Sequence, residues 1–319
     1  MTGREANRRP TAPPALQLHP ETVRTLLDSL QPATRHTYQH KWAEYVAYVS
    51  ADRRRECPSE ASSSTLANFL QSLLSRGLAF CSLSAYLAAI AFMFKLHGRE
   101  DPTRQFLVTQ LLKGARIKAH WLPARRLPLT RRLLHRLLGA LQGVCCSTYK
   151  KTWYRALFSL TFYAYLRPGE VTYARKGQHT LRLDQITLSR TGIDIVFASY
   201  KHSAGRTPTL NLSADPYSKY CPVRAMANYI ERPGMEPGPI FQDETGAPVT
   251  RLDFTRVLRA AIRALGLPPN DYAPHSFRIG RAMQMSKDGL APAAIRAVGR
   301  WKSDVFHSYV RQDVIPLPR

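Results

Sequence analysis

The sequence contains widely spaced basic, aromatic and hydroxyl-bearing residues that together could cleave a phosphodiester. Such a reaction concentrates negative charge on the non-bridging phosphate oxygens, which the forked donors of arginine can stabilise. It also needs a nucleophile to attack phosphorus and a general acid to protonate the leaving hydroxyl. The candidates for these tasks occur along the chain in the order Arg167, Lys201, His275, Arg278, Trp301 and Tyr309.

Three of these candidates lie in two stretches that suit phosphate chemistry. His275 and Arg278 form the stretch HSFR after Pro274. It is expected to start a helix, where a phosphate binds readily and where a spacing of three puts both side chains on one face. Arg167 ends an apolar helix in YLRPGEV, and Glu170 follows three positions later. An alternative for Arg167 is a solvated charge that suits the C-terminal end of the helix dipole.

The other three candidates have ordinary explanations when each is taken alone. Lys201 lies in the turn KHSAGR between two expected strands, where most lysines are plain surface residues. Trp301 is either a packed residue or an indole N–H donor. Tyr309 lies in WKSDVFHSYVR at the spacing of a buried aromatic on a last helix. Only the combination of all these residues favours chemistry.

A metal-dependent nuclease is disfavoured by the sequence. Such enzymes need clustered carboxylates to hold their ions, and the acidic residues here are few and scattered. The five cysteines include no CxxC pair and no zinc-type His/Cys spacing, which indicates free thiols in a reducing, intracellular compartment. We therefore expect no metal and no other cofactor.

The net charge points to a polyanionic partner. Lysine and arginine number 46 against 22 acidic residues, which gives a formal charge of +24 and a pI near 10.3. The basic residues spread along the chain, as suits a protein that wraps a phosphate backbone, and this favours nucleic acid over a membrane surface. A basic but uninvolved surface is the remaining alternative. The residues assigned to DNA contact are Arg35, Lys41, Arg125 and Arg126.

The first part of the chain is expected to be helical. Residues 1–20 have the composition of a basic, proline-rich mobile tail without the apolar run of a signal peptide. Four helical patterns follow, and they predict a compact all-helical domain over residues 21–120. In the second pattern, Ser64 or Thr65 is expected to begin the helix and Gly77 to stop it. The four patterns cover residues 34–49, 64–77, 82–98 and 103–120.

A linker at 121–128, marked by WLPARRLP, leads into a second domain at 129–319. Thr130 is expected to cap the first helix of that domain, and a strongly apolar helix over 152–166 must be buried. Segments 181–188, 193–200 and 207–212 predict a small antiparallel sheet. Further helices are expected after Cys221, over 250–266, 275–289 and 292–299, and across the segment that carries Tyr309. The predicted fold class is mainly α with a small antiparallel sheet.

Taken together, the ordered candidates resemble the catalytic set of the tyrosine recombinases, the phage-type integrases. HSFRIGRAMQMSKDGLAPAAIRAVGRW followed by YVR is similar to the Cre-type arrangement, and HSFRIG, GRWKSD and LRPGE are similar to recombinases of eukaryotic DIRS-like and Crypton mobile elements. The resemblance implies a helical core-binding domain followed by an α+β catalytic domain. It also implies a metal-free, site-specific recombinase or integrase.

The resemblance implies a role for each candidate. Tyr309 would form a 3′-phosphotyrosyl bond, while Arg167 and Arg278 hold the non-bridging oxygens. Lys201 would protonate the 5′-hydroxyl and His275 would assist proton transfer. Trp301 would also contact the phosphate, and Glu170 would orient the side chain of Arg167 or of His275.

The resemblance also implies a partner, an assembly and a location. The partner is double-stranded DNA, bound by a homo-tetramer on two sites in the nucleus, with no small-molecule substrate and no membrane. One departure is the interval between Trp301 and Tyr309, which is one residue shorter than in the Cre-type arrangement. A silent, domesticated DNA-binding protein and a type IB topoisomerase-like enzyme are the alternatives.

Overall fold

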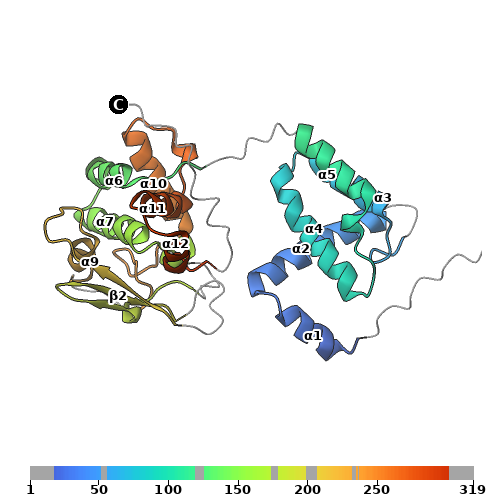
Figure 1. The fold of residues 1–319 in the computed structure, drawn as a ribbon, viewed down its shortest axis with the longest axis horizontal. Coiled ribbons are helices and arrows are strands. Elements are labelled where there is room, and N and C mark those ends of the chain that lie inside the picture. Colours follow the sequence, from blue (N-terminus) through green and yellow to red (C-terminus); the bar gives the residue numbers. More distant parts are fainter. Residues whose placement is uncertain are drawn as a thin grey trace, which may run out of the picture. The chain divides into compact units, whose positions relative to one another are not determined.

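The computed structural model describes residues 18–51, 56–118, 126–173, 179–198, 207–231, 235 and 237–301. These residues form two compact units that divide after residue 123 (Figure 1). The predicted boundaries of the tail, the linker and the two domains remain predictions. Within the described residues, no helix combines the length and the apolar character that crossing a membrane requires.

The described part of the first unit is helical throughout. Its aromatic core is built around Phe69, whose ring packs edge-on against those of Tyr45 and Tyr86. One helix, α1, was not predicted; it is nine residues long and buries none of them, although Val23, Leu26 and Leu27 lie at helical spacing. The helices are α1 (Pro20–Asp28), α2 (Pro32–Ala51), α3 (Ser63–Ser75), α4 (Leu83–Leu96) and α5 (Phe106–Lys118).

Two helix starts in this unit differ from the prediction. The cap of α3 is Ser62, whose hydroxyl accepts from the Thr65 backbone N–H at 3.3 Å, so the predicted starts at Ser64 and Thr65 lie inside the helix. Gly77, just past the end of α3, has a φ of +85°, which confirms it as the stop. Helix α5 begins at Phe106, because a separate 3₁₀ turn occupies Pro102–Arg104.

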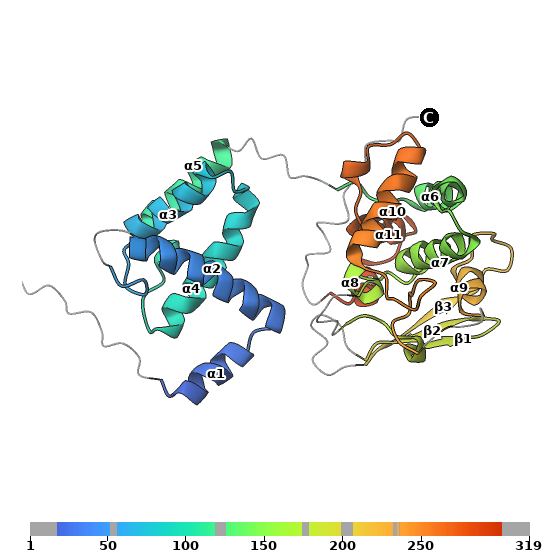
Figure 2. The same cartoon turned by 180° about the vertical axis from the view of Figure 1, so that it is seen from behind.

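The second unit packs its helices around α7 (Figure 2). The side chains of α7 are almost all buried from Trp153 to Phe162. Helices α6 and α9 pack against α7, and α11 contacts it from another side. Thr130 caps α6 as predicted, since its hydroxyl accepts from the Leu133 N–H at 3.2 Å. The helices are α6 (Arg131–Val144), α7 (Thr148–Tyr163), α8 (Pro168–Val171), α9 (Pro222–Ile230), α10 (Arg251–Ala264), α11 (His275–Lys287) and α12 (Pro292–Val298).

A three-stranded antiparallel sheet completes the second unit, in the order β1-β2-β3. The strands are β1 (Ile186–Leu188), β2 (Gly192–Val196) and β3 (Thr209–Ser213). Ile193 and Ile195 of the central strand are fully buried and pair with residues of both neighbours. The predicted fold class, mainly helical with a small antiparallel sheet, is therefore confirmed, although each strand is shorter than its predicted segment.

Candidate active site

Arg167 lies in the turn that joins α7 to α8. The chain leaves α7 through Tyr165, which has a φ of +56°, and Arg167 then caps α8 with Pro168 as the first helical residue. The side chain of Arg167 is 18% exposed. It is thus not the solvated charge at a helix C-terminus that the sequence left open, but a partly buried group at the start of the next helix.

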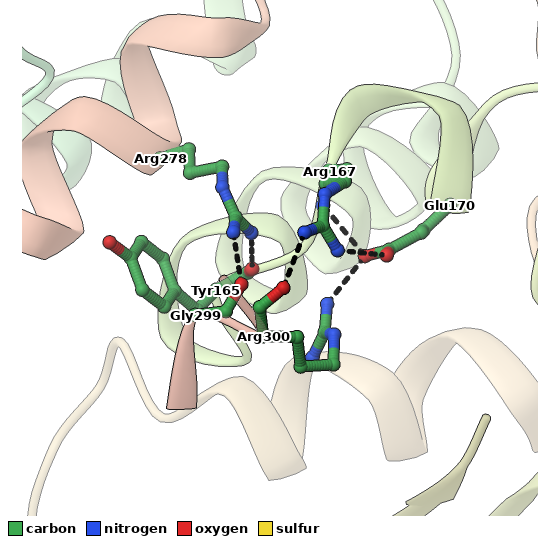
Figure 3. Close-up of polar contacts among 6 residues, drawn as sticks. All are labelled: Tyr165, Arg167, Glu170, Arg278, Gly299 and Arg300. Carbon is green, nitrogen blue, oxygen red and sulfur yellow. Dashed lines mark hydrogen bonds and ion pairs between the residues drawn. The ribbon is translucent and has the colours of Figure 1, made fainter. Parts of the chain in front are cut away.

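Glu170 holds Arg167 from within the protein (Figure 3). Its carboxylate accepts the Arg167 backbone N–H at Oε2 (2.7 Å) and the Arg167 Nη1 at Oε1 (3.1 Å). The Glu170 Oε2 also accepts Arg300 Nη2 at 2.7 Å. At 1% exposed, Glu170 is a buried carboxylate shared by two arginines, and charge-assisted bonds of this kind fix geometry strongly.

Helix α11 carries His275 and Arg278, and close backbone packing determines its position. The Leu129 N–H donates to the Ser276 carbonyl at 2.9 Å. A Cβ built on Gly280 would lie 1.8 Å from the Leu129 carbonyl oxygen, so only glycine permits this approach. The start of the second unit is thus tied directly to the helix with the two candidate residues.

Arg278 is almost sealed inside the protein. It is 1% exposed, and its Nη1 and Nη2 donate to the backbone carbonyls of Tyr165 (2.7 Å) and Gly299 (Figure 3). Its guanidinium lies 4.6 Å from the ring centres of both Tyr165 and Trp301. Burial, with the nearby charge of Arg167, lowers the pKa of Arg278 to about 10. In this structure a phosphate reaches Arg278 only after part of this cover moves.

His275 is half-buried at the first turn of α11, in strongly basic surroundings. Burial is the main cause that lowers its pKa to about 4, and Arg278, Arg126, Arg251 and Arg167 add to the effect. The imidazole is therefore neutral at neutral pH. A neutral imidazole can accept a proton, and an arriving phosphate would raise its pKa again.

Trp301 packs beside Arg278. Its ring meets the Tyr165 ring edge-on at 5.3 Å between centres, and it joins a small apolar cluster with Ile295. A Cβ on Gly299 would lie 2.6 Å from the Trp301 ring, so this packing also needs a glycine. The structure thus brings Arg167, Arg278, His275, Glu170 and Trp301 into one region. Lys201, Tyr309 and Arg125 lie outside the described residues.

The residues assigned to DNA contact differ in their surroundings. Arg35 pairs with Asp28 at 2.7 Å, and Lys41 donates to the Tyr86 hydroxyl at 2.9 Å. Both side chains are therefore engaged by groups of their own unit. Arg126 is exposed and close enough to His275 to depress its pKa. Among the described residues, no group of three or more His, Cys, Asp or Glu could hold a metal ion.

Arg300 is the residue of this region that the sequence reasoning missed. Its side chain is only 6% exposed and pairs with Glu170. The sequence did contain a signal for it. The interval from Trp301 to Tyr309 is one residue shorter than in the Cre-type arrangement, and Arg300 lies one residue before Trp301 in GRWKSD. The short interval is therefore a reason to consider Arg300 as well as Trp301 for this position.

No family model matches the sequence. The chain is 21% identical over 291 residues to an integrase/recombinase described as a xerD homolog of Selenomonas ruminantium, covering 86% of this chain and 80% of that protein. This similarity supports a relation to the tyrosine recombinase/integrase family.

Solved recombinase structures share the fold. The XerH site-specific recombinase, in a post-cleavage complex with palindromic difH substrate, matches with a TM-score of 0.62 and 13% identity, over 92% of this chain and 81% of that one. The Tn1549 transposon integrase, in complex with transposon right end DNA, matches with 0.62 and 15%, over 92% and 95%. A lambda integrase dimer bound to a core site matches with 0.57 and 15%, over 95% and 85%. The chain therefore has the tyrosine recombinase fold.

Proposed function

We propose that this protein is a site-specific DNA recombinase that cleaves and rejoins DNA through a 3′-phosphotyrosyl intermediate. The observation that carries the proposal is the convergence of Arg167 and Arg278, far apart in sequence, on the backbone around residues 299 and 300. Two guanidinium groups near one point form a natural binding place for a phosphodiester. The fold, shared with DNA-bound recombinases, supports the same conclusion.

The proposed chemistry is a transfer of the phosphoryl group to Tyr309 and back. The phenolic oxygen of Tyr309 attacks phosphorus, the bond from phosphorus to the 5′-oxygen breaks, and Lys201 gives that oxygen a proton. Rejoining reverses these steps when the 5′-hydroxyl of another strand attacks the phosphotyrosyl bond and releases Tyr309. Because the covalent bond conserves the energy of the phosphodiester, neither a nucleotide nor a metal ion is required.

The described residues support this reaction in distinct ways. Arg167 and Arg278 stabilise the charge on the non-bridging oxygens, and Glu170 holds Arg167 in place. His275, neutral in the free protein because burial lowers its pKa to about 4, can accept the proton that Tyr309 loses. Trp301 packs beside Arg278 and lies next to the phosphate.

The partner in this proposal is double-stranded DNA, and the assembly is a tetramer on two sites. The excess of positive charge, +24 over the whole chain, supports the polyanionic partner. Origin from a DIRS-like or Crypton mobile element, with a nuclear location, depends on the motifs HSFRIG, LRPGE and GRWKSD alone.

A DNA-binding protein without cleavage is the second candidate, and one observation favours it. Arg278 is 1% exposed and its terminal nitrogens are held by backbone carbonyls. In such a protein this closed arrangement would persist on DNA, whereas a recombinase must open it.

The deciding experiment is covalent capture on DNA. A cognate site is first selected from random duplexes with purified protein, and the protein is then incubated with that site and denatured in SDS. A recombinase gives an SDS-resistant adduct that Tyr309→Phe abolishes while binding is retained. An undiminished adduct from Tyr309→Phe would refute the nucleophile. Tight binding without any adduct from the wild-type protein would establish the second candidate.

A further inference from the structure

Arg300 lies where three segments of the second unit meet. It follows Gly299 at the end of α12 and has a φ of +53°, a conformation that residues other than glycine seldom adopt. Its side chain is 6% exposed. An arginine that is both buried and in an unfavourable backbone conformation must be held by specific contacts.

The contacts of Arg300 lead to the groups that surround Arg167. Its Nη2 donates to Glu170 Oε2 at 2.7 Å, and its backbone carbonyl accepts Arg167 Nη2 at 2.8 Å (Figure 3). Its guanidinium lies 4.0 Å from the ring centre of Phe197, just after β2. The side chain of Arg300 thus holds Glu170, and its backbone carbonyl holds Arg167, so both parts of Arg300 belong to one hydrogen-bond network.

The position of the Arg167 guanidinium depends on this network. Nη1 of Arg167 is held by Glu170 Oε1 and Nη2 by the Arg300 carbonyl. Glu170 in turn is held at its other oxygen by Arg300. Loss of the Arg300 side chain therefore removes one of the two bonds at Glu170 Oε2 and leaves that from the Arg167 backbone N–H, so the carboxylate that orients Arg167 is held less firmly.

Arg300 also changes the charge that Arg167 can offer to a phosphate. A single buried arginine paired with a single glutamate is neutral as a unit. Two arginines that share Glu170 leave a net charge of +1, so part of the field of Arg167 remains available to an anion.

We propose that Arg300 is a positioning residue that acts through Glu170 to fix Arg167 against the scissile phosphate and to preserve its positive field. This inference rests on the proposed recombinase function. Arg300 itself need not contact the DNA, because its side chain is only 6% exposed, donates from Nη2 to Glu170 and stacks on the Phe197 ring.

The test compares Arg300→Met and Arg300→Lys with wild-type protein on a selected cognate duplex. Met keeps the length but removes the charge, and Lys keeps the charge but lacks the fork. The matched control is Arg131→Met, which breaks the half-exposed pair of Arg131 with Asp288 (3.3 Å). The rate of SDS-resistant adduct formation is measured at saturating protein, and the Kd is measured by fluorescence anisotropy.

We expect Arg300→Met to form the adduct about 10- to 100-fold more slowly, because small displacements of a catalytic group have effects of that size. The Kd should change by less than about threefold, since one phosphate contact contributes little to total DNA affinity. Arg300→Lys should recover part of the rate, and Arg131→Met should match the wild type.

A second substrate separates positioning from general weakening of the fold. A methylphosphonate at the scissile position is uncharged, so it has less need of Arg167. The defect of Arg300→Met should therefore shrink on this substrate if Arg300 acts through Arg167. An equal defect on both substrates would overturn the proposal, as would parallel losses of binding and rate.

The outcomes also separate this inference from the proposed function. If the wild-type protein forms no adduct, the recombinase function fails and the inference fails with it. If the wild type forms the adduct and Arg300→Met is equally fast, the inference alone fails. Should Arg300→Met not fold, Arg300→Lys decides, because its defect must also shrink on the methylphosphonate.

Discussion

Replacement of Gly280 by alanine should separate α11 from the start of the second unit. The new Cβ would lie 1.8 Å from the Leu129 carbonyl oxygen, 2.4 Å from its carbon and 2.9 Å from its nitrogen. Ordinary contacts begin near 3.4 Å, so the helix must retreat by roughly 1.6 Å in an interior that is close-packed. The obstacle is backbone on both sides, which no side-chain rotation can relieve.

The expected cost of Gly280→Ala is at least about 3 kcal/mol in the free energy of unfolding. Overpacking a core typically costs about 1–3 kcal/mol, and a clash between two backbones belongs at the upper end. The displacement also weakens the bond of 2.9 Å from the Leu129 N–H to the Ser276 carbonyl. Because α11 carries His275 and Arg278, adduct formation should fall by about 100-fold or more where the protein still folds.

A matched control is Gly139→Ala in α6. Gly139 is exposed inside that helix, and a Cβ there has no atom within 4 Å. The same substitution should stabilise the protein here by about 0.5–1 kcal/mol, because alanine favours the helix. Both variants are measured by urea denaturation. A Gly280→Ala protein as stable as the wild type would refute the backbone-contact argument, and a destabilising Gly139→Ala would invalidate the comparison.

Three further expectations follow from the site and from the charge of the chain. Glu170→Gln should lower the free energy of unfolding, measured by urea denaturation, by about 2–4 kcal/mol, because two buried arginines lose their counter-charge. Asp288→Asn, at a half-exposed pair, should lower it by less than about 0.5 kcal/mol. Similar costs for the two variants would contradict the reasoning. For His275, whose pKa falls from 6.5 to about 4 on folding, the unfolded chain binds the extra proton between those values. Stability should thus drop as the pH falls through this window, by at most roughly 3 kcal/mol, and His275→Gln should show a shallower drop; an unchanged pH dependence would exclude the imidazole as its source. The observed DNA-binding constant should fall steeply and linearly with salt on a double-logarithmic plot, and a flat response would remove the polyanion argument.

Much of the fold follows from local sequence patterns. The apolar run of α7 predicts a buried helix because nearly every side chain over its second half faces the core. The caps at Thr130 and the stop at Gly77 obey short-range rules that need no tertiary information. Helix α1 was not predicted although Val23, Leu26 and Leu27 have helical spacing, because a segment of nine residues carries too short a pattern to be distinguished from the tail before it.

The site was less predictable, because its partners are distant in sequence and many are backbone atoms. The spacing of His275 and Arg278 predicts a shared helix, yet Arg278 is sealed by carbonyls of Tyr165 and Gly299. No residue type signals a carbonyl acceptor that far away. In the first unit, Arg35 and Lys41 were assigned to DNA from their charge alone, which cannot show that each also has a partner within its own unit; their contact with DNA stays a prediction.

The charge balance around α8 and α11 is consistent with the proposed phosphate site. Three arginines, Arg167, Arg278 and Arg300, lie largely buried with Glu170 as the carboxylate that two of them share. Backbone carbonyls supply dipoles to the remaining one but no charge, and burial, with the nearby charge of Arg167, lowers the pKa of Arg278. Burying surplus positive charge is costly unless a counter-charge arrives. Under the proposed function, a phosphate bound beside Arg167 supplies it, and the arrangement that destabilises the free protein is then the one that favours binding of DNA.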